Sequence, residues 1–291
     1  MPDTRCHTRH PLDMGYIVSV NRLPSFKASK GPHLVLGSAQ WGMDYGITNQ
    51  TGQVPPTTIR TILKQATDVW IDTAVAYGQA ETVIGNLTIK RPLVTKLQAG
   101  NRLADSLHRL SVNQVAGVLV HDEANHDDAM WHHLQTERDS GRAAAIGVSL
   151  YTPEALNWWL ERDIDMVQLP LNILDQRFLK WLPRLKERGI VVHARSPFLQ
   201  GLLLTPLDQL PPYFHPIRPL LSRIPEPRLP TLLGFLRQIP GLDGVVVGVT
   251  SLAEYQQVNH AMMGPIPDID WEKWVCHDNA MILPIHWPAI S

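Results

Sequence analysis

The sequence lacks several features that mark large classes of protein. It has only two cysteines, Cys6 and Cys276, with no CxxC pair and no Cys/His spacing typical of a zinc site. This scarcity excludes a disulfide framework and favours a reducing compartment. No apolar run reaches the roughly 20 residues of a membrane helix, and the first residues lack the apolar core of a secretory signal. We therefore expect a cytoplasmic protein with no metal ion and no membrane partner.

An excess of charge of one sign is also absent. The chain carries 26 Lys and Arg against 27 Asp and Glu, with no long run of like charge. Such a balance offers no electrostatic surface for nucleic acid, so we expect a small molecule as the partner. The hydrophobic fraction of 44% is ordinary for a globular protein that buries a large core.

What the sequence does contain is a repeated alternation of apolar segments and helix-compatible segments. The apolar segments are short, rich in Val, Ile and Leu, and not strictly alternating, which is typical of strands buried on both faces. These expected strands span residues 33–39, 69–74, 92–97, 115–121, 144–150, 165–170, 190–196 and 244–249. The expected helices span residues 57–67, 79–87, 102–110, 127–140, 153–162, 175–188 and 252–262. The proline-rich stretches PPYFHPIRP and RIPEPRLP predict loop and short helix near the site.

This alternation predicts an α/β fold with a parallel sheet. Eight strands favour a single-domain (β/α)8 TIM barrel over an open doubly wound sheet, and no GxGxxG turn follows the first strand. We expect residues 1–31 to be an N-terminal tail or hairpin and residues 32–265 to form the barrel. Residues 266–291 would then be a C-terminal segment that packs on the barrel.

Ionisable side chains end three successive apolar strands, and chemistry in such barrels is carried at the C-terminal strand ends. Asp72, Lys96 and His121 are separated by 24 and 25 residues, and Tyr77 follows Asp72 by five. An Asp–Lys pair beside Tyr77 is expected to lower the pKa of the phenol and make it a general acid. A neutral His121 could hold a carbonyl oxygen. Each residue alone is more often structural, so the prediction depends on all four.

The same residues resemble a known family. The segment IDTAVAYGQAE (residues 71–81), followed by VTK (94–96) and LVH (119–121), resembles the signature and next two catalytic strands of the aldo-keto reductases. The likeness runs from about Leu34 to Met262. It implies a catalytic tetrad in which Tyr77 donates a proton while hydride passes directly from a nicotinamide, with no metal. The tetrad is Asp72, Tyr77, Lys96 and His121.

The resemblance also implies cofactor-binding residues, position by position. Ser149 and Gln168 match the family's carboxamide-binding pair, although Leu150 replaces the usual Asn. Arg195 replaces the aromatic residue that commonly stacks on the nicotinamide, and a guanidinium plane can also stack. The pyrophosphate side is matched by Ser196, Phe198 and Gly201, and the adenosine side by Gly248, Thr250, Ser251, Glu254 and Gln257.

The cofactor is expected to be NADPH or NADH. Members that prefer NADPH place a Lys and an Arg near the adenosine, and this chain has neither between Gly248 and Met262. Glu254 falls near the Arg position, where a carboxylate repels a 2′-phosphate but accepts hydrogen bonds from a free ribose hydroxyl. The sequence thus favours NADH, or the use of both.

The expected substrate is a carbonyl compound or a sugar, including a nucleotide-linked sugar. Gln40, Trp41 and Tyr45 should line a polar mouth, and arginine there suits phosphate or carboxylate. Arg195 and residues of the proline-rich loop would join them, namely Tyr213, His215 and Arg218. Two other functions stay open at this point: a non-catalytic subunit that senses nicotinamide nucleotides, and a barrel lyase or aldolase that uses Lys96 as a Schiff base.

Overall fold

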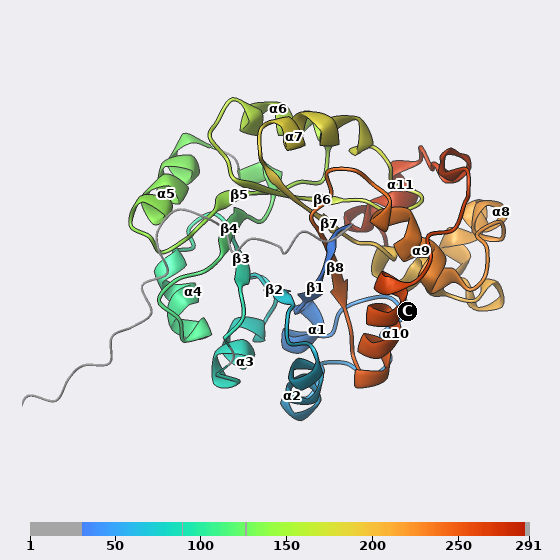
Figure 1. Cartoon of the computed structure of the whole chain (residues 1–291), viewed down its shortest axis with the longest axis horizontal. Helices are drawn as coiled ribbons and strands as arrows, with labels where there is room; N and C mark the ends of the chain where they lie inside the picture. The colour runs from blue at the N-terminus through green and yellow to red at the C-terminus, as the bar shows by residue number, and fades with distance from the viewer. Residues whose placement is uncertain (1–30, 89, 126, 289–291) are drawn as a thin grey trace, which may run out of the picture.

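The protein is a closed parallel barrel, as seen in a computed structural model that describes residues 31–88, 90–125 and 127–288 (Figure 1). The strands follow one another around the ring in chain order, and β1 closes it by pairing with β8. They are β1 (His33–Gly37), β2 (Trp70–Asp72), β3 (Leu93–Leu97), β4 (Gly117–Val120), β5 (Ile146–Ser149), β6 (Met166–Pro170), β7 (Val191–Arg195) and β8 (Gly244–Gly248). The predicted (β/α)8 fold is confirmed.

Helices surround this ring of strands in Figure 1. The α-helices are α1 (Ala39–Gly42), α2 (Pro56–Gln65), α3 (Ala80–Asn86), α4 (Leu103–Leu110), α5 (Asp128–Asp139), α6 (Pro153–Leu160), α7 (Leu182–Glu187), α8 (Arg218–Leu221), α9 (Arg228–Arg237), α10 (Leu252–Met263) and α11 (Asn279–Ile282). The 3-10 turns are η1 (Glu123–Asn125), η2 (Leu179–Trp181), η3 (Leu199–Leu204), η4 (Leu207–Gln209), η5 (Pro212–Ile217), η6 (Trp271–Trp274) and η7 (Pro284–His286).

Two helices differ from the sequence-based expectation. The helix expected from residue 175 begins only at η2, because the Asn172 Oδ1 accepts the backbone N–H groups of Leu174 and Asp175 and turns the chain there. The proline-rich stretch after β7 holds a ten-residue helix, α9. Its Pro227 and Pro230 lie at the N-cap and in the first turn, where no intrahelical donor is lost.

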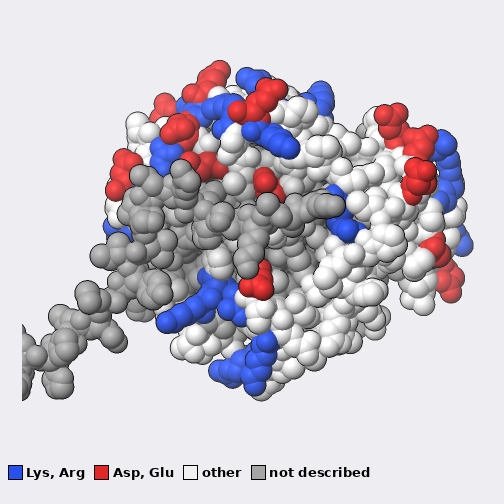
Figure 2. All heavy atoms as spheres, viewed as in Figure 1, with Lys and Arg blue, Asp and Glu red and all other residues white. Residues whose placement is uncertain are grey.

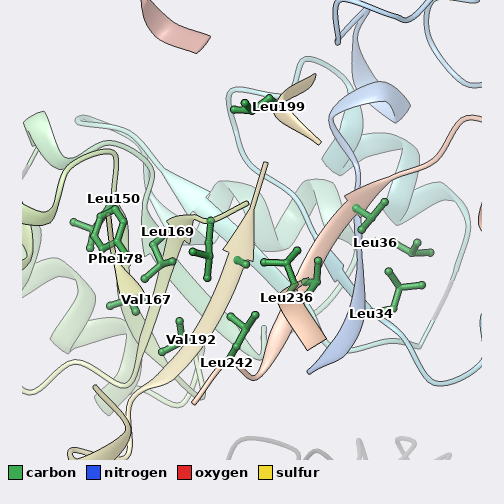
Figure 3. Close-up of a cluster of buried hydrophobic side chains, with 14 of the residues drawn as sticks. Leu34, Leu36, Leu150, Val167, Leu169, Phe178, Val192, Leu199, Leu236 and Leu242 are labelled. Atoms are coloured by element: carbon green, nitrogen blue, oxygen red, sulfur yellow. The ribbon is translucent and has the colours of Figure 1, made fainter. Parts of the chain in front are cut away.

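Buried side chains form two layers, one inside the barrel and one between the strands and helices. In β1, Leu34 and Leu36 belong to the outer layer, whereas Val35 between them belongs to the inner one. This alternation follows from the two-residue period of a strand. Figure 3 shows outer-layer side chains on the neighbouring strands β6 and β7, among them Val167 and Val192.

A histidine also lies inside the barrel. His193 of β7 is fully buried, and its ring meets the ring of Trp70 edge-on at 5.8 Å between centroids. Gly244 on β8 leaves room for it, because a Cβ there would lie 2.7 Å from the imidazole. Burial lowers the pKa of His193 to about 3, so the ring is neutral.

The segment after α10 runs back over the loops that follow β6 and β7. The Cys276 N–H donates to the Leu174 carbonyl at 2.9 Å, and the Tyr213 hydroxyl donates to the Ala280 carbonyl at 3.0 Å. Trp274 and Ile282 are buried there. The expected tail or hairpin of residues 1–31 lies outside the described residues except for Gly31.

The described part of the chain contains no helix that is both long and apolar enough to cross a membrane. On the described surface that faces the reader in Figure 2, acidic and basic side chains are intermingled rather than gathered by sign. No His, Cys, Asp and Glu side chains of the described ranges gather in a group of three or more that could hold a metal ion.

Candidate active site

A cavity of about 720 Å³ opens at the C-terminal ends of the strands. Its wall includes residues at the ends of β1, β2, β5, β6, β7 and β8, because parallel strands that close a barrel all end at one rim. Most of the residues predicted for catalysis and for the cofactor line it: Asp72, Tyr77, His121, Ser149, Gln168, Arg195, Ser196, Phe198, Gly201, Gly248, Thr250, Glu254 and Gln257.

Asp72 and Lys96 form a buried ion pair beneath this cavity. The Lys96 Nζ lies 2.5 Å from the Asp72 Oδ1 and donates to the Thr73 carbonyl at 3.1 Å. The other carboxylate oxygen of Asp72 accepts a hydrogen bond of 2.7 Å from the Gln168 Nε2. Burial lowers the pKa of Lys96, and the Asp72 carboxylate opposes that shift. These contacts fix both side chains, so the Lys96 amine can act on a neighbouring group through its charge.

Tyr77 reaches this pair from the loop between β2 and α3. Its hydroxyl lies 3.2 Å from the Lys96 Nζ. The loop can take this course because two glycines meet beneath it. A Cβ on Gly42 would lie 1.9 Å from the Tyr77 carbonyl, and Gly78 has a positive φ of 55° and faces the Gly42 carbonyl. The glycine of the signature therefore sets the position of its tyrosine.

The prediction that the pKa of Tyr77 is lowered is wrong, because the structure raises it. Burial raises the pKa of the phenol, and the Asp72 carboxylate raises it further, whereas Arg195 opposes the shift. The loss of water around the buried phenol disfavours the charged phenolate, and this is the largest influence on its pKa. Tyr77 is consequently protonated at neutral pH, which is the form that a proton donor needs.

His121 stands beside Tyr77 at the end of β4. Its ring meets the tyrosine ring edge-on, with centroids 5.5 Å apart and planes at 87°. Burial, followed by the charges of Lys96 and Arg195, lowers the pKa of His121 to about 3. The ring is therefore neutral and carries one N–H, and its buried Nδ1 has no hydrogen-bond partner among the described residues.

Tyr151, which sequence reasoning missed, completes this end of the cavity. Its ring lies under the guanidinium of Arg195, whose Cζ is 4.3 Å from the ring centroid. The Tyr151 N–H donates to the Glu123 carboxylate at 2.7 Å, and the Tyr151 carbonyl accepts from Arg177 at 3.2 Å. A signal was present, since Tyr151 lies only two positions beyond Ser149, at a strand end where site residues are expected.

The loop after β7 forms a second wall of the cavity with unusual backbone. Ser196, Leu199 and Gln200 have positive φ values of 56°, 46° and 55°, and Gly201 follows with 97°. A Cβ on Gly201 would lie 2.1 Å from the Thr48 hydroxyl oxygen, so only glycine lets these two loops meet. Residues with strained backbone cluster at functional sites.

The turn between β8 and α10 forms the far end. The Ser251 Oγ caps α10 by accepting the Glu254 N–H at 3.1 Å, so Ser251 supports the turn and does not line the cavity. The Thr250 N–H donates to the Glu254 Oε2 at 2.7 Å. The backbone N–H of Thr250 is thus already occupied by the carboxylate of Glu254.

Some of the residues expected to contact the substrate do not line the cavity. Gln40 and Tyr45 line the cavity, but Trp41 is fully buried in the core beside them and does not. Tyr213, His215 and Arg218 are also absent from the cavity wall, because the proline-rich stretch folds against the C-terminal segment instead. Trp41 and this trio therefore do not join Gln40 and Tyr45 at the cavity wall. Sequence reasoning missed the contributions of the loop around Asn49 and of Leu229 from α9.

A family model described as "Aldo/keto reductase family" matches residues 33–220. A curated relative from Bacillus subtilis (strain 168), the "Uncharacterized oxidoreductase YqkF", is 27% identical; the match covers 51% of this chain and 59% of that protein. The chain thus spans little more than half of that relative's length.

Solved structures share the fold at low identity. The holo form of the aldo-keto reductase AKR11C1 from Bacillus halodurans superposes with a TM-score of 0.67 at 21% identity, covering 83% of this chain and 89% of that one. An aldo-keto reductase from Klebsiella pneumoniae, solved in complex with NADPH, has a TM-score of 0.65 at 17% identity, covering 87% and 94%. At such identities the likeness shows the fold.

Proposed function

Because this chain belongs to the aldo/keto reductase family, we propose that it reduces an aldehyde or ketone with a nicotinamide cofactor, or oxidises the corresponding alcohol or sugar. One observation carries the proposal. The Tyr77 hydroxyl lies at the cavity wall, 3.2 Å from the Lys96 Nζ, with the neutral ring of His121 beside it. A proton donor, a cation that stabilises its anion and a neutral hydrogen-bond donor are what carbonyl reduction requires.

The donors and acceptors around the cavity fit a nicotinamide dinucleotide. The Nε2 of Gln168 is taken by Asp72 at 2.7 Å, which leaves its carbonyl oxygen to accept from a carboxamide, and Ser149 lines the wall beside it. The loop from Ser196 to Gly201 would hold the pyrophosphate, where the absence of a Cβ on Gly201 keeps the loops close. Thr250, Glu254 and Gln257 would hold the adenosine end.

When bound, a reduced nicotinamide supplies a hydride to the carbonyl carbon. The carbonyl oxygen then gains the electron pair of the broken double bond and takes the proton of the Tyr77 hydroxyl. The ammonium of Lys96, 3.2 Å away, stabilises the phenolate that remains. The N–H of the neutral His121 orients the carbonyl oxygen. Asp72 keeps Lys96 in place and charged, and does not itself exchange a proton in this step.

We further propose that the enzyme uses NADH, or both cofactors. Arg195 is the only Lys or Arg that lines the cavity within the described part of the chain, and it stands at the Tyr77 end. At the far end, where Glu254 lies, the described wall therefore offers no Lys or Arg to a 2′-phosphate. A thermal-shift titration with NADH and with NADPH tests this, because a ligand that binds the folded state raises the melting temperature according to its affinity.

Single-turnover oxidation of the bound cofactor tests the function itself. The protein is loaded with NADH or NADPH and mixed with a simple aldehyde, and the loss of cofactor absorbance is followed. We expect a single exponential whose rate depends on Tyr77. Binding without any oxidation would instead support the alternative of a non-catalytic sensor of nicotinamide nucleotides. An aldolase or lyase that uses Lys96 as a Schiff base is disfavoured, because the Lys96 side chain is buried and engaged with Asp72, Thr73 and Tyr77.

A further inference from the structure

We propose that Arg195 binds an oxyanion group of the substrate, a carboxylate or a phosphate ester, so that the preferred carbonyl compounds are acidic ones. The inference rests on the proposed reductase function and names its substrate class. It follows from three properties of Arg195: the way its side chain is held, the lack of an acidic partner, and its place at the catalytic end of the cavity.

The guanidinium of Arg195 is held on one face and one edge. Tyr151 lies under its plane at 4.3 Å, and the Nη2 donates to the Leu150 carbonyl at 2.8 Å. Tyr151 is itself fixed, because Glu123 accepts its N–H and Arg177 donates to its carbonyl. A guanidinium held this way loses little side-chain entropy when it binds a ligand, which is the condition for a preorganised recognition group.

Arg195 lacks a carboxylate partner. Several other half-buried arginines are paired with a carboxylate: Arg177 with Asp175, Arg138 with Asp165 and Arg162 with Asp128. Two more, Arg91 and Arg237, lie outside the cavity and donate to backbone carbonyls. No Asp or Glu of the described residues lies within ion-pair distance of Arg195, and its buried Nε has no hydrogen-bond partner among them. A half-buried cation that lacks a counterion is stabilised by an anion that enters its site.

The charges around the cavity place that anion next to the reacting carbonyl. At the catalytic end, Asp72 is neutralised by Lys96, and His121 is neutral. Arg195 is close enough to His121 for its charge to contribute to the low pKa of that ring. The catalytic end therefore carries one uncompensated positive charge. Glu254, the other acidic residue in the wall, lies at the far end and binds Thr250.

Isomeric aldehydes test how far Arg195 lies from the reacting carbonyl, because each isomer holds its oxyanion at a different fixed distance from its own carbonyl. The full-length protein with saturating NADH or NADPH is assayed with benzaldehyde, with 2-, 3- and 4-formylbenzoate, with their methyl esters, and with 4-formylphenyl phosphate. We expect at least one acid to exceed its neutral ester in kcat/KM by about 10- to 100-fold, the range of a hydrogen bond to a charged group. The phosphate compound distinguishes a carboxylate site from a phosphate site.

Two substitutions assign the preference to Arg195. Arg195→Gln should reduce the ratio of kcat/KM between the acid and its ester by about 10- to 100-fold. Arg195→Lys should retain part of it, because the charge stays while the planar fork is lost. Arg162→Gln is the matched control: Arg162 also stacks on an aromatic ring, that of Trp158, but lies outside the cavity. It should leave the ratio unchanged.

Equal losses for acid and ester in Arg195→Gln would overturn the inference and assign Arg195 to the cofactor or to the carbonyl oxygen. Equal kcat/KM for acid and ester in the unaltered protein would overturn it too. A direct binding measurement separates this failure from failure of the reductase proposal. Calorimetric titration of 4-(hydroxymethyl)benzoate into NAD(P)⁺-saturated protein should show binding that Arg195→Gln removes. Such binding without turnover of any aldehyde would leave the anion site in place while the reductase proposal fails.

Discussion

The two ends of the cavity are built in different ways. The catalytic end is formed by side chains on strands and on the loop that Gly42 and Gly78 hold in place. There the Lys96 Nζ lies 2.5 Å from the Asp72 Oδ1 and 3.2 Å from the Tyr77 hydroxyl. The other end is shaped mainly by backbone, namely by the loop with positive φ values between Ser196 and Gly201 and by the capped start of α10. We therefore expect a substitution at the catalytic end to change the rate of the chemical step, and one at the other end to change the affinity for the cofactor.

Replacement of Tyr77 by phenylalanine tests the first half of this comparison and should have the largest effect. Tyr77→Phe removes the proton donor, and general acid catalysis contributes about 10²- to 10⁴-fold, so kcat should fall by that factor. The dissociation constant of NAD(P)H should stay nearly the same. Stopped-flow single turnover measures the first quantity and fluorescence titration the second. Tyr213→Phe, whose hydroxyl binds the Ala280 carbonyl outside the cavity, is the control. Full activity in Tyr77→Phe would refute the assignment.

The buried pair should also support the fold at this end. Lys96→Met leaves the Asp72 carboxylate buried without its cation and should lower the free energy of unfolding by about 3–5 kcal/mol, as removal of one partner of a buried pair does. Urea denaturation measures it, and the double substitution Asp72→Asn with Lys96→Met should recover part of the loss. Arg102→Met, which breaks an exposed pair with Asp105, should change stability by less than about 0.5 kcal/mol. If Lys96→Met lowered the free energy of unfolding no more than Arg102→Met does, the pair of Asp72 and Lys96 would add no stability.

Gly201→Ala examines the backbone-built end. A Cβ there meets Thr48 at 2.1 Å, and alanine disfavours a φ of 97°, so the loop should shift. Overpacking of this kind costs about 1–3 kcal/mol, which should appear as weaker NAD(P)H binding at a preserved single-turnover rate. Gly52→Ala is a matched control, because Gly52 also has a positive φ of 69° but nothing within 4 Å of a Cβ. A slower chemical step in Gly201→Ala with unchanged binding would contradict the division between the two ends.

Glu254→Arg should give the smallest effect and sharpen the cofactor assignment. It replaces a carboxylate by a cation that suits a 2′-phosphate, so the ratio of NADPH to NADH affinity should rise by about tenfold, equivalent to ~1.4 kcal/mol. Fluorescence titration of both cofactors measures it. Glu254→Gln separates charge from capping, since its amide oxygen can still accept the Thr250 N–H. If the ratio stays the same in Glu254→Arg, Glu254 does not face the ribose.

The sequence predicted the barrel and the catalytic end for one physical reason. Strands buried on both faces are continuous apolar runs, so an Asp, Lys or His at the end of such a run is conspicuous, and parallel strands bring such ends together at one rim. The positions of Asp72, Lys96 and His121 followed from that spacing. The fully buried Lys96, which elsewhere would be an exception, is explained by the carboxylate one strand away.

What the sequence did not reveal depends on contacts between distant loops. Gln40 and Trp41 are adjacent in α1, just after β1, yet the Trp41 side chain enters the core and the Gln40 side chain lines the cavity. The proline-rich stretch turned toward the C-terminal segment, a contact 67 residues apart in the chain between Tyr213 and Ala280. The pKa direction of Tyr77 needed burial as well as charge, and burial is a property of the folded chain.

His193 makes the stability of the barrel sensitive to acid. The unfolded chain binds a proton on this imidazole near pH 6.5, whereas the folded chain, with the pKa at about 3, does not. Acidification below pH 6.5 therefore favours unfolding, by up to about 1.4 kcal/mol for each pH unit. His121, whose pKa in the folded chain is also about 3, stays neutral over the same range and adds a second contribution of the same sign. A fall in pH therefore lowers the stability of the fold, while both imidazoles stay neutral in the molecules that remain folded.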